Sequence, residues 1–190
     1  MSKVRGITML FASGAMAAGF GLAGAPAALA DGPETPPEVV AAIEAAAWPE
    51  LTEGQETWEV SVVKFLLVEY GYLDVTEATE HFDERLGDAV ADYRQDRGLE
   101  PARAVDGDVW EALTDDLGVV RQGDSGNRVK AVQYALLEGH GYDLLLDGEF
   151  GPATRTAVVD FQTGAEIDAD GEVGPITFQA LLTPDDVSVR

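Results

Sequence analysis

The clearest periodic pattern in the chain lies between residues 128 and 138. Its apolar positions, at separations of three, four and one, are Val129, Val132, Leu136 and Leu137. Such spacing places side chains along one side of an α-helix and predicts a helix over Arg128–Glu138 with a buried stripe. The turn Gly123–Gly126 precedes this helix. Gly139 and Gly141 are expected to end it, because glycine readily adopts the backbone conformation that closes many helices.

Two further helices are predicted downstream. Pro152 and Pro175 each stand where a helix would begin, since the fixed φ of proline suits the first helical position. The apolar positions that follow are Ala157, Val158 and Phe161 in one case, and Phe178, Leu181 and Leu182 in the other. Gly164 is expected to stop the first of the two. Residues 117–184 are therefore predicted to form a small three-helix bundle.

The same apolar skeleton occurs earlier, over residues 50–116. Equal separations relate Gly54-Val60 to Gly123-Val129, Phe82-Val90-Tyr93 to Phe150-Val158-Phe161, and Trp110-Leu113 to Phe178-Leu181. We therefore predict an all-α fold with two tandem three-helix bundles, an arrangement typical of internal repeats. Each unit is near the lower size limit for an independent core, so the two are expected to pack together and stabilise each other. The alternative is a chance alignment of unrelated amphipathic helices.

Residues 1–30 have the order of a secretory signal peptide. Lys3 and Arg5 give a basic start, an apolar stretch follows, and Ala28-Leu29-Ala30 places small residues around a cleavage site. An uncleaved membrane anchor is the alternative, since residues 6–30 carry no charge. The many glycines and alanines and the interrupting Pro26 favour cleavage. A secreted protein without a stable membrane anchor is therefore predicted.

Residues 31–49 are predicted to be a Pro-rich linker followed by a short helix. The linker is polar and stiff, as proline-rich segments are. The helix is expected over Glu38–Trp48, with Thr35 as its cap and Pro49 as its end. Its apolar face consists of Val39, Val40, Ile43 and Ala47. This face is expected to dock on the next unit.

Charge and the absence of cysteine narrow the possible partners. The chain holds 12 basic and 35 acidic residues, a net charge of −23, and removal of residues 1–30 would make it −25. A charge of this sign opposes binding to nucleic acids and anionic lipids. It also suits simple solubility in a salty medium. Without cysteine there is no disulfide, no thiol nucleophile and no lipid attachment through a cysteine.

Residues 117–184 also carry a set of motifs in a recognisable order. They are Gly123-Asp124-Ser125-Gly126, Val129 to Gln133, Gly141-Tyr142, Asp147-Gly148-Glu149-Phe150-Gly151, Thr154, Ala157-Val158, Phe161-Gln162, Asp170-Gly171 and Gly174-Pro175. In this order and at these separations, the segment resembles the peptidoglycan-binding-like domain family. The resemblance implies a three-helix fold of exported proteins, often attached to cell-wall hydrolases and proteases. It also implies recognition of peptidoglycan or a related cell-wall glycan or peptide.

Residues 50–116 depart from that pattern. Thr79-Glu80 replaces the Asp-Gly pair, Asp83-Glu84 stands where Gly-Pro would be, and Arg94 replaces a glutamine. The loop before Trp110 is also shorter. This unit is interpreted as a degenerate copy with a structural role.

Turns and helix starts explain most of the motif without a ligand, because Asp-Gly favours tight turns and Gly-Pro favours helix starts. Ligand-binding residues are expected among the polar groups near the loops, since sugars and peptides are held by hydrogen bonds and an aromatic face. These candidates are Gln133, His140, Tyr142, Asp147 and Gln162.

Catalytic and metal chemistry are not indicated. The two histidines, His81 and His140, lack the spacing of zinc ligands, and there is no G-x-S-x-G nucleophile motif. The acidic segment Glu166–Gly171 resembles part of a calcium loop, but Thr177 stands where a bidentate glutamate is needed. It is read as a turn. No catalytic residue, metal or cofactor is predicted.

The leading prediction is a secreted, non-catalytic module that binds peptidoglycan or a related cell-wall polymer, outside the cell or on its wall. One alternative is an acidic interaction partner or inhibitor of an exported enzyme. A second is a hydrolase, because 35 acidic residues could supply a pair of catalytic carboxylates.

Overall fold

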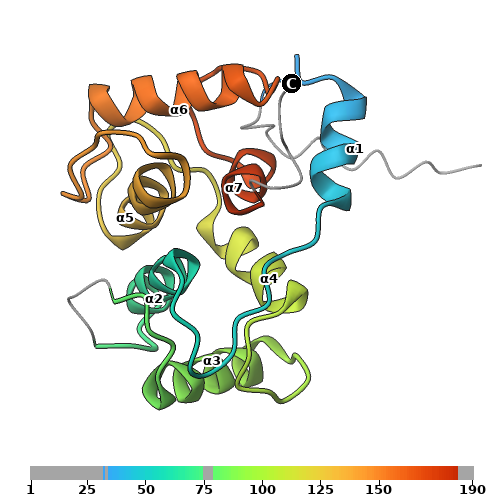
Figure 1. Cartoon of the computed structure of the whole chain (residues 1–190), viewed down its shortest axis with the longest axis vertical. Coiled ribbons are helices and arrows are strands. Elements are labelled where there is room, and N and C mark those ends of the chain that lie inside the picture. The colour runs from blue at the N-terminus through green and yellow to red at the C-terminus, as the bar shows by residue number, and fades with distance from the viewer. Residues whose placement is uncertain (1–31, 33, 75–78, 184–190) are drawn as a thin grey trace, which may run out of the picture.

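The computed structural model describes residues 32, 34–74 and 79–183, and every regular element within these ranges is helical (Figure 1). In chain order the elements are α1 (Pro37–Ala45), α2 (Trp58–Glu69), α3 (Glu84–Arg97), α4 (Gly107–Leu117), α5 (Asn127–Tyr134), the π-helical turn η1 (Ala135–Gly139), α6 (Pro152–Gly164) and α7 (Pro175–Leu182). The all-α prediction is confirmed. The predicted signal peptide, residues 1–30, lies outside the described residues. None of the described helices is long and apolar enough to span a bilayer.

Each half of the molecule contains two isolated antiparallel β-bridges. The N-terminal half, α2–α4, has Leu51 paired with Val105 and Glu56 with His81, and the C-terminal half, α5–α7, has Val120 paired with Val173 and Ser125 with Glu149. Each residue of the second set lies 68 or 69 positions after its counterpart in the first. The match between the halves therefore extends from apolar spacing to backbone pairing. An ancestral duplication stays a prediction.

The two halves share one hydrophobic core. Buried apolar side chains from both halves, with Ile43 of α1, form a single contiguous cluster. Its centre is the contact of α2 with α5, the most extensive between any two described helices, and the two lie side by side in Figure 1. Across this contact the rings of Phe65 and Tyr134 meet edge to face, with centroids 5.8 Å apart. The predicted mutual support is thus found, but the expectation of two separate bundles is not confirmed.

Helix boundaries in the C-terminal half follow proline and glycine closely. Pro152 and Pro175 are the first residues of α6 and α7, and Gly164 is the last residue of α6, as predicted. The helix expected over Arg128–Glu138 has the right extent but not a uniform geometry, because its last turn is the π-helical η1. A Cβ on Gly139 would lie 2.9 Å from Cζ2 of Trp58, so glycine permits this turn to approach α2.

Helix α1 differs from its prediction in extent, cap and partner. It ends at Ala45, and its N-cap is Pro36, which makes no side-chain hydrogen bond. Thr35, the predicted cap, instead accepts a hydrogen bond at its Oγ1 from the backbone N–H of Asp168, at 3.0 Å. The helix packs on α7 of the C-terminal half rather than on the next unit, with Ile43 fully buried. An amphipathic pattern shows that one face is buried, but not which surface buries it.

The residues after α1 return to the N-terminal half. Pro49 disfavours helical backbone at Trp48, which helps to explain why the helix ends early. The Trp48 ring stacks on Trp110 with centroids 5.9 Å apart, and Trp110 Nε1 donates a 2.8 Å hydrogen bond to the carbonyl oxygen of Pro49. Residues 37–49 therefore pack against both α7 of the C-terminal half and α4 of the N-terminal half.

Candidate functional site

A buried glutamine holds the loop between η1 and α6. Gln133 Nε2 donates to Asp147 Oδ1 at 2.8 Å, to the Glu149 carbonyl at 3.2 Å and to Thr154 Oγ1 at 3.3 Å. Its Oε1 accepts the backbone N–H of Gly148 at 2.9 Å. Only 1% of Gln133 is exposed. Both ends of this amide are therefore used by the protein's own loop.

A second glutamine repeats this arrangement in the loop before α7. Gln162 Nε2 donates to Asp170 Oδ1 at 2.9 Å, to the Glu172 carbonyl at 2.8 Å and to Thr177 Oγ1 at 3.2 Å, and its Oε1 accepts the Gly171 N–H at 2.9 Å. Gln162 is fully buried. Gln162 therefore holds the backbone of this loop, and the acidic segment before Gly171 is a turn.

These two networks come from a repeated octapeptide that the sequence analysis did not connect. Residues 147–154 read DGEFGPAT and residues 170–177 read DGEVGPIT, so six of eight positions are identical. Gly148 and Gly171 have φ of +74° and +76°, in the left-handed region that favours glycine. This repeat within the C-terminal half is the sequence feature that predicts the same structure for both loops.

In the N-terminal half, cations take the places of the two glutamines. Lys64, at the position of Gln133, donates from Nζ to Oγ1 and the carbonyl of Thr79 and to the His81 carbonyl. Arg94, at the position of Gln162, donates from Nη1 to Asp106 Oδ1 at 2.8 Å. Both are buried. Burial lowers the pKa of Lys64, and the nearby Asp83 carboxylate opposes that shift.

The Arg94 exchange is evident from the sequence, whereas the Lys64 exchange is not, because a lysine usually indicates a surface position.

Asp147 and Tyr142 reach the surface of the C-terminal half. Asp147 is exposed, and hydrogen bonds from Gln133 Nε2 and the Glu149 N–H lower its pKa. Tyr142 is half-buried, and its hydroxyl donates to Asp160 Oδ2 at 3.2 Å. Burial, followed by the charge of Asp160, raises the pKa of Tyr142 to about 12. The phenol is therefore neutral at physiological pH and acts as a donor.

His140 faces inward. Its Nε2 donates to the Leu181 carbonyl at 2.9 Å, and its ring meets Phe161 edge to face at 4.7 Å. Burial lowers its pKa, and the hydrogen bond to the backbone carbonyl opposes that shift. Of the five predicted ligand-binding residues, only Tyr142 and Asp147 therefore present polar atoms in an exposed loop. Leu145, which the sequence analysis passed over, lies between them and is 78% exposed.

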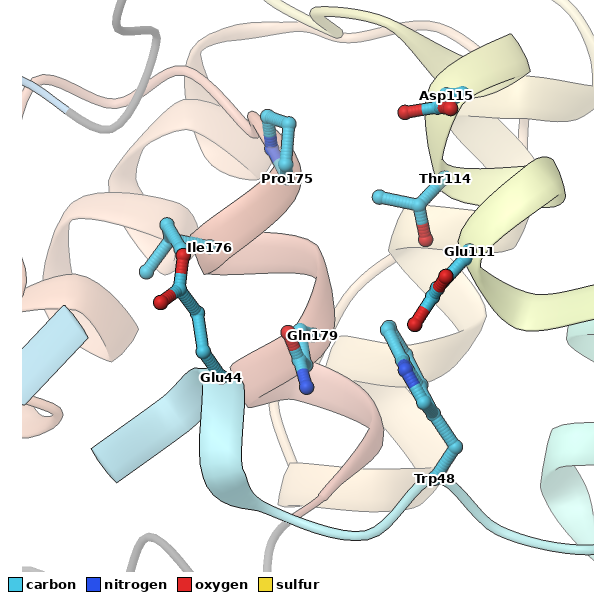
Figure 2. Close-up of a pocket in the computed structure, with 8 residues that line it drawn as sticks. All are labelled: Glu44, Trp48, Glu111, Thr114, Asp115, Pro175, Ile176 and Gln179. Carbon is cyan, nitrogen blue, oxygen red and sulfur yellow. The ribbon is translucent and has the colours of Figure 1, made fainter. Parts of the chain in front are cut away.

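A separate groove of about 420 Å³ lies between α1, α4 and α7 (Figure 2). Its lining residues are Glu44, Trp48, Glu111, Thr114, Asp115, Pro175, Ile176 and Gln179. Figure 2 shows Glu44 on one wall, Glu111 and Asp115 on the other, and Gln179 between them. No sequence pattern predicts this groove, because the residues that line it come from three distant segments of the chain.

Within the described ranges, no three His, Cys, Asp or Glu side chains are grouped so that they could hold a metal ion.

The C-terminal half is similar in sequence to known proteins. Residues 125–181 match the model of a family described as putative peptidoglycan binding domain. A solved peptidoglycan-binding protein from Clostridioides difficile, in complex with glutamine hydroxamate, is 42% identical over 35% of this chain and 41% of that chain, with a TM-score of 0.34.

Two curated relatives are enzymes by name. The zinc D-Ala-D-Ala carboxypeptidase of Streptomyces albus G is 41% identical over 66 residues, which cover 34% of this chain and 26% of the relative. The N-acetylmuramoyl-L-alanine amidase CwlM of Mycobacterium tuberculosis is 31% identical over 153 residues, which cover 67% of this chain and 36% of the relative. The chain thus spans only about a quarter to a third of the length of these relatives, and the second similarity extends beyond residues 125–181.

Proposed function

We propose that this chain is an exported, non-catalytic module that binds peptidoglycan or a related cell-wall polymer through its C-terminal half. The family match over residues 125–181 carries the proposal. The names of the two enzyme relatives refer to D-Ala-D-Ala and N-acetylmuramoyl-L-alanine, and both are groups of cell-wall chemistry. The same similarity supports an extracellular or wall-associated location.

The proposed contact surface is the loop between η1 and α6. Tyr142 offers an aromatic ring and a hydroxyl, Leu145 offers exposed apolar surface, and Asp147 offers a carboxylate that can accept hydrogen bonds from sugar hydroxyls or peptide N–H groups. In this proposal Gln133 and Gln162 shape the loops instead of touching the ligand. His140 fixes the start of the loop to α7.

The placement of His140 and Tyr142 supports a binding role over a catalytic one. The Nε2–H of His140 is held by a backbone carbonyl, so this nitrogen is not free to exchange a proton with a substrate. The high pKa of Tyr142 makes it a poor general base near pH 7.

Retention of the purified full chain on isolated cell-wall sacculi tests this proposal. Tyr142→Ala is expected to weaken retention about threefold to tenfold, the effect of one aromatic contact of roughly 0.5–1.5 kcal/mol. The matched control is Tyr72→Ala in the N-terminal half, where Tyr72 is also half-buried and donates to a carboxylate, that of Asp96. Circular dichroism would confirm that both variants fold. Absence of retention of the wild-type chain at moderate salt would refute wall binding.

The acidity of the chain supports a second candidate, an interaction partner or inhibitor of an exported enzyme. A net charge of −23 would attract a basic protein over a range that salt shortens. Salt-sensitive capture of a basic exported protein, without retention on sacculi, would favour this candidate over the first.

A further inference from the structure

The groove between α1, α4 and α7 combines negative charge with an aromatic wall. Glu44, Glu111 and Asp115 are exposed and come from two helices on opposite sides, and the residues that line the groove include no basic side chain. Trp48 is half-buried, with one face stacked on Trp110 at an interplanar angle of 13°. A positive charge placed between these walls would meet carboxylates and an indole ring, and both attract cations.

The floor of the groove holds a buried polar group that is poorly paired. Gln179 is only 8% exposed, and its Nε2 makes one long hydrogen bond, 3.5 Å, to the Ala46 carbonyl. Figure 2 shows this amide aimed into the space between Glu44 and Glu111. The carboxamide oxygen of Gln179 can accept a hydrogen bond from a ligand N–H at this point.

The apolar part of the lining defines the rest of the ligand. Pro175 and Ile176 extend from the N-terminal turn of α7 and line one side, with Trp48 opposite. A volume of about 420 Å³ lies within the size range of small-molecule sites and is too small for a folded partner. The groove therefore suits a short alkyl stem that ends in a positive donor.

We infer that this groove binds the side-chain ammonium of a diamino acid in a short peptide, with the ammonium between the carboxylates of α1 and α4, and the stem against Trp48. The inference rests on the proposed function, because the peptides that cross-link the wall carry such residues. It adds a second contact to that function, whose charged residues lie on α1 and α4, outside the segment 125–181 that matches the family. It also assigns a binding role to the degenerate half.

Calorimetric titration of the full chain tests the inference with a defined probe, the tripeptide Ala-γ-Glu-Lys as its C-terminal amide. The free ε-amino form is expected to bind, and the Nε-acetyl form, which lacks the charge, is expected to bind at least about tenfold more weakly. The double variant Glu111→Gln, Asp115→Asn is expected to weaken binding of the free form about fivefold. Increasing salt should reduce the difference between the two peptides.

The matched control is the double variant Asp92→Asn, Glu138→Gln, which removes the same charge from two exposed positions outside the groove lining. It should bind the free tripeptide as the wild type does. Equal affinity for the two peptides, equal weakening in both double variants, or no binding of the free form would overturn the inference. Equal affinity for Gly-Gly-Lys amide would overturn the assignment to a wall peptide, because any lysine side chain would then suffice.

The two proposals fail separately. Retention on sacculi without tripeptide binding would leave wall recognition intact and remove the ammonium site. Tripeptide binding that requires the free ε-amino group, without retention on sacculi, would support the groove as an ammonium site and refute polymer binding by the loop between η1 and α6.

Discussion

The two halves of the molecule build the same backbone with different polar chemistry. In the C-terminal half, Gln133 and Gln162 hold the loops as neutral amides, and in the N-terminal half Lys64 and Arg94 hold them as cations. An amide has a donor and an acceptor, whereas an ammonium or guanidinium has donors only. Only the glutamines can therefore also accept a backbone N–H.

This difference explains why a loop and its buried side chain change together. Gln133 Oε1 accepts the N–H of Gly148, which lies in a left-handed turn. Lys64 cannot accept this bond, and its loop has Thr79-Glu80 in place of Asp147-Gly148. The loop of the N-terminal half instead points oxygen atoms at the lysine. The departure from the family pattern is therefore an alternative set of hydrogen bonds, and not merely the loss of one.

The largest expected effect tests whether the halves are independent. Phe82 and Phe150 occupy equivalent positions and are 0% and 2% exposed. Truncation of either to alanine is expected to lower the free energy of unfolding by about 3–5 kcal/mol, because it leaves a cavity in a close-packed core. Since the core is one cluster, each variant should still unfold in a single transition, measured by calorimetry. Leu145→Ala, at an exposed position, serves as the control.

Two separate transitions, with only one of them shifted by each substitution, would show that the halves fold independently.

The next prediction tests whether a lysine can replace the buried amide of Gln133, as Lys64 does in the N-terminal half. Gln133→Lys is expected to destabilise the chain by about 2 kcal/mol, because the Gly148 N–H would be buried without an acceptor. Gln122→Lys makes the same change at an exposed position and is expected to stay within about 0.5 kcal/mol of wild type. Urea denaturation measures both. Equal stability of the two variants would mean that the Gly148 hydrogen bond contributes little.

Substitutions at the N-caps of α3 and α6 are expected to change the free energy of unfolding by less, and in opposite directions. Asp83 Oδ1 accepts the Leu86 N–H at 2.8 Å and caps α3, whereas Gly151 at the equivalent position caps α6 without a side chain. Asp83→Ala should cost about 1 kcal/mol. Gly151→Asp should gain about 0.3 kcal/mol, because φ at Gly151 is −87° and permits a side chain.

Asp92→Ala, within α3 and exposed, provides the control for loss of a carboxylate without loss of a cap. A destabilised Gly151→Asp variant would show that the start of α6 has no room for the cap.

The smallest expected effect is confined to acid pH. The pKa of His140 is lowered by burial below its ordinary value of 6.5, so the folded state binds this proton less readily than the unfolded state. The stability that this histidine confers is fully present above pH 6.5 and is lost as the pH falls towards the lowered value. His140→Gln can still donate to the Leu181 carbonyl and should flatten this part of the stability profile, measured by urea denaturation. His81→Gln, at an exposed histidine of the N-terminal half, is the matched substitution outside this site.

The sequence predicted those features that depend on local backbone chemistry. Pro152 and Pro175 start helices because their φ is fixed, and the apolar stripe of Val129, Val132 and Leu136 is fully buried as its period requires. The position of α1 depends on a surface of α7 more than 130 residues away, which no local pattern encodes. The groove is hidden for the same reason, since Trp48 and Gln179 meet only in the folded chain. The role of Lys64 could not be predicted, because two of its partners are backbone carbonyl oxygens, which sequence letters do not display.

The attachment of α1 to α7 sets the route by which tension would cross the molecule. The Glu34 N–H and Thr35 Oγ1 bond Asp168, and Ile43 is buried where α1 meets α7. A pull on the segment before α1, against a ligand held by the C-terminal half, would be borne by α1 and α7 without loading α2 and α3. We expect force spectroscopy, pulling from residue 34 against residue 182, to detach α1 first and leave the shared core folded. Early rupture of the contact between α2 and α5 would exclude this route.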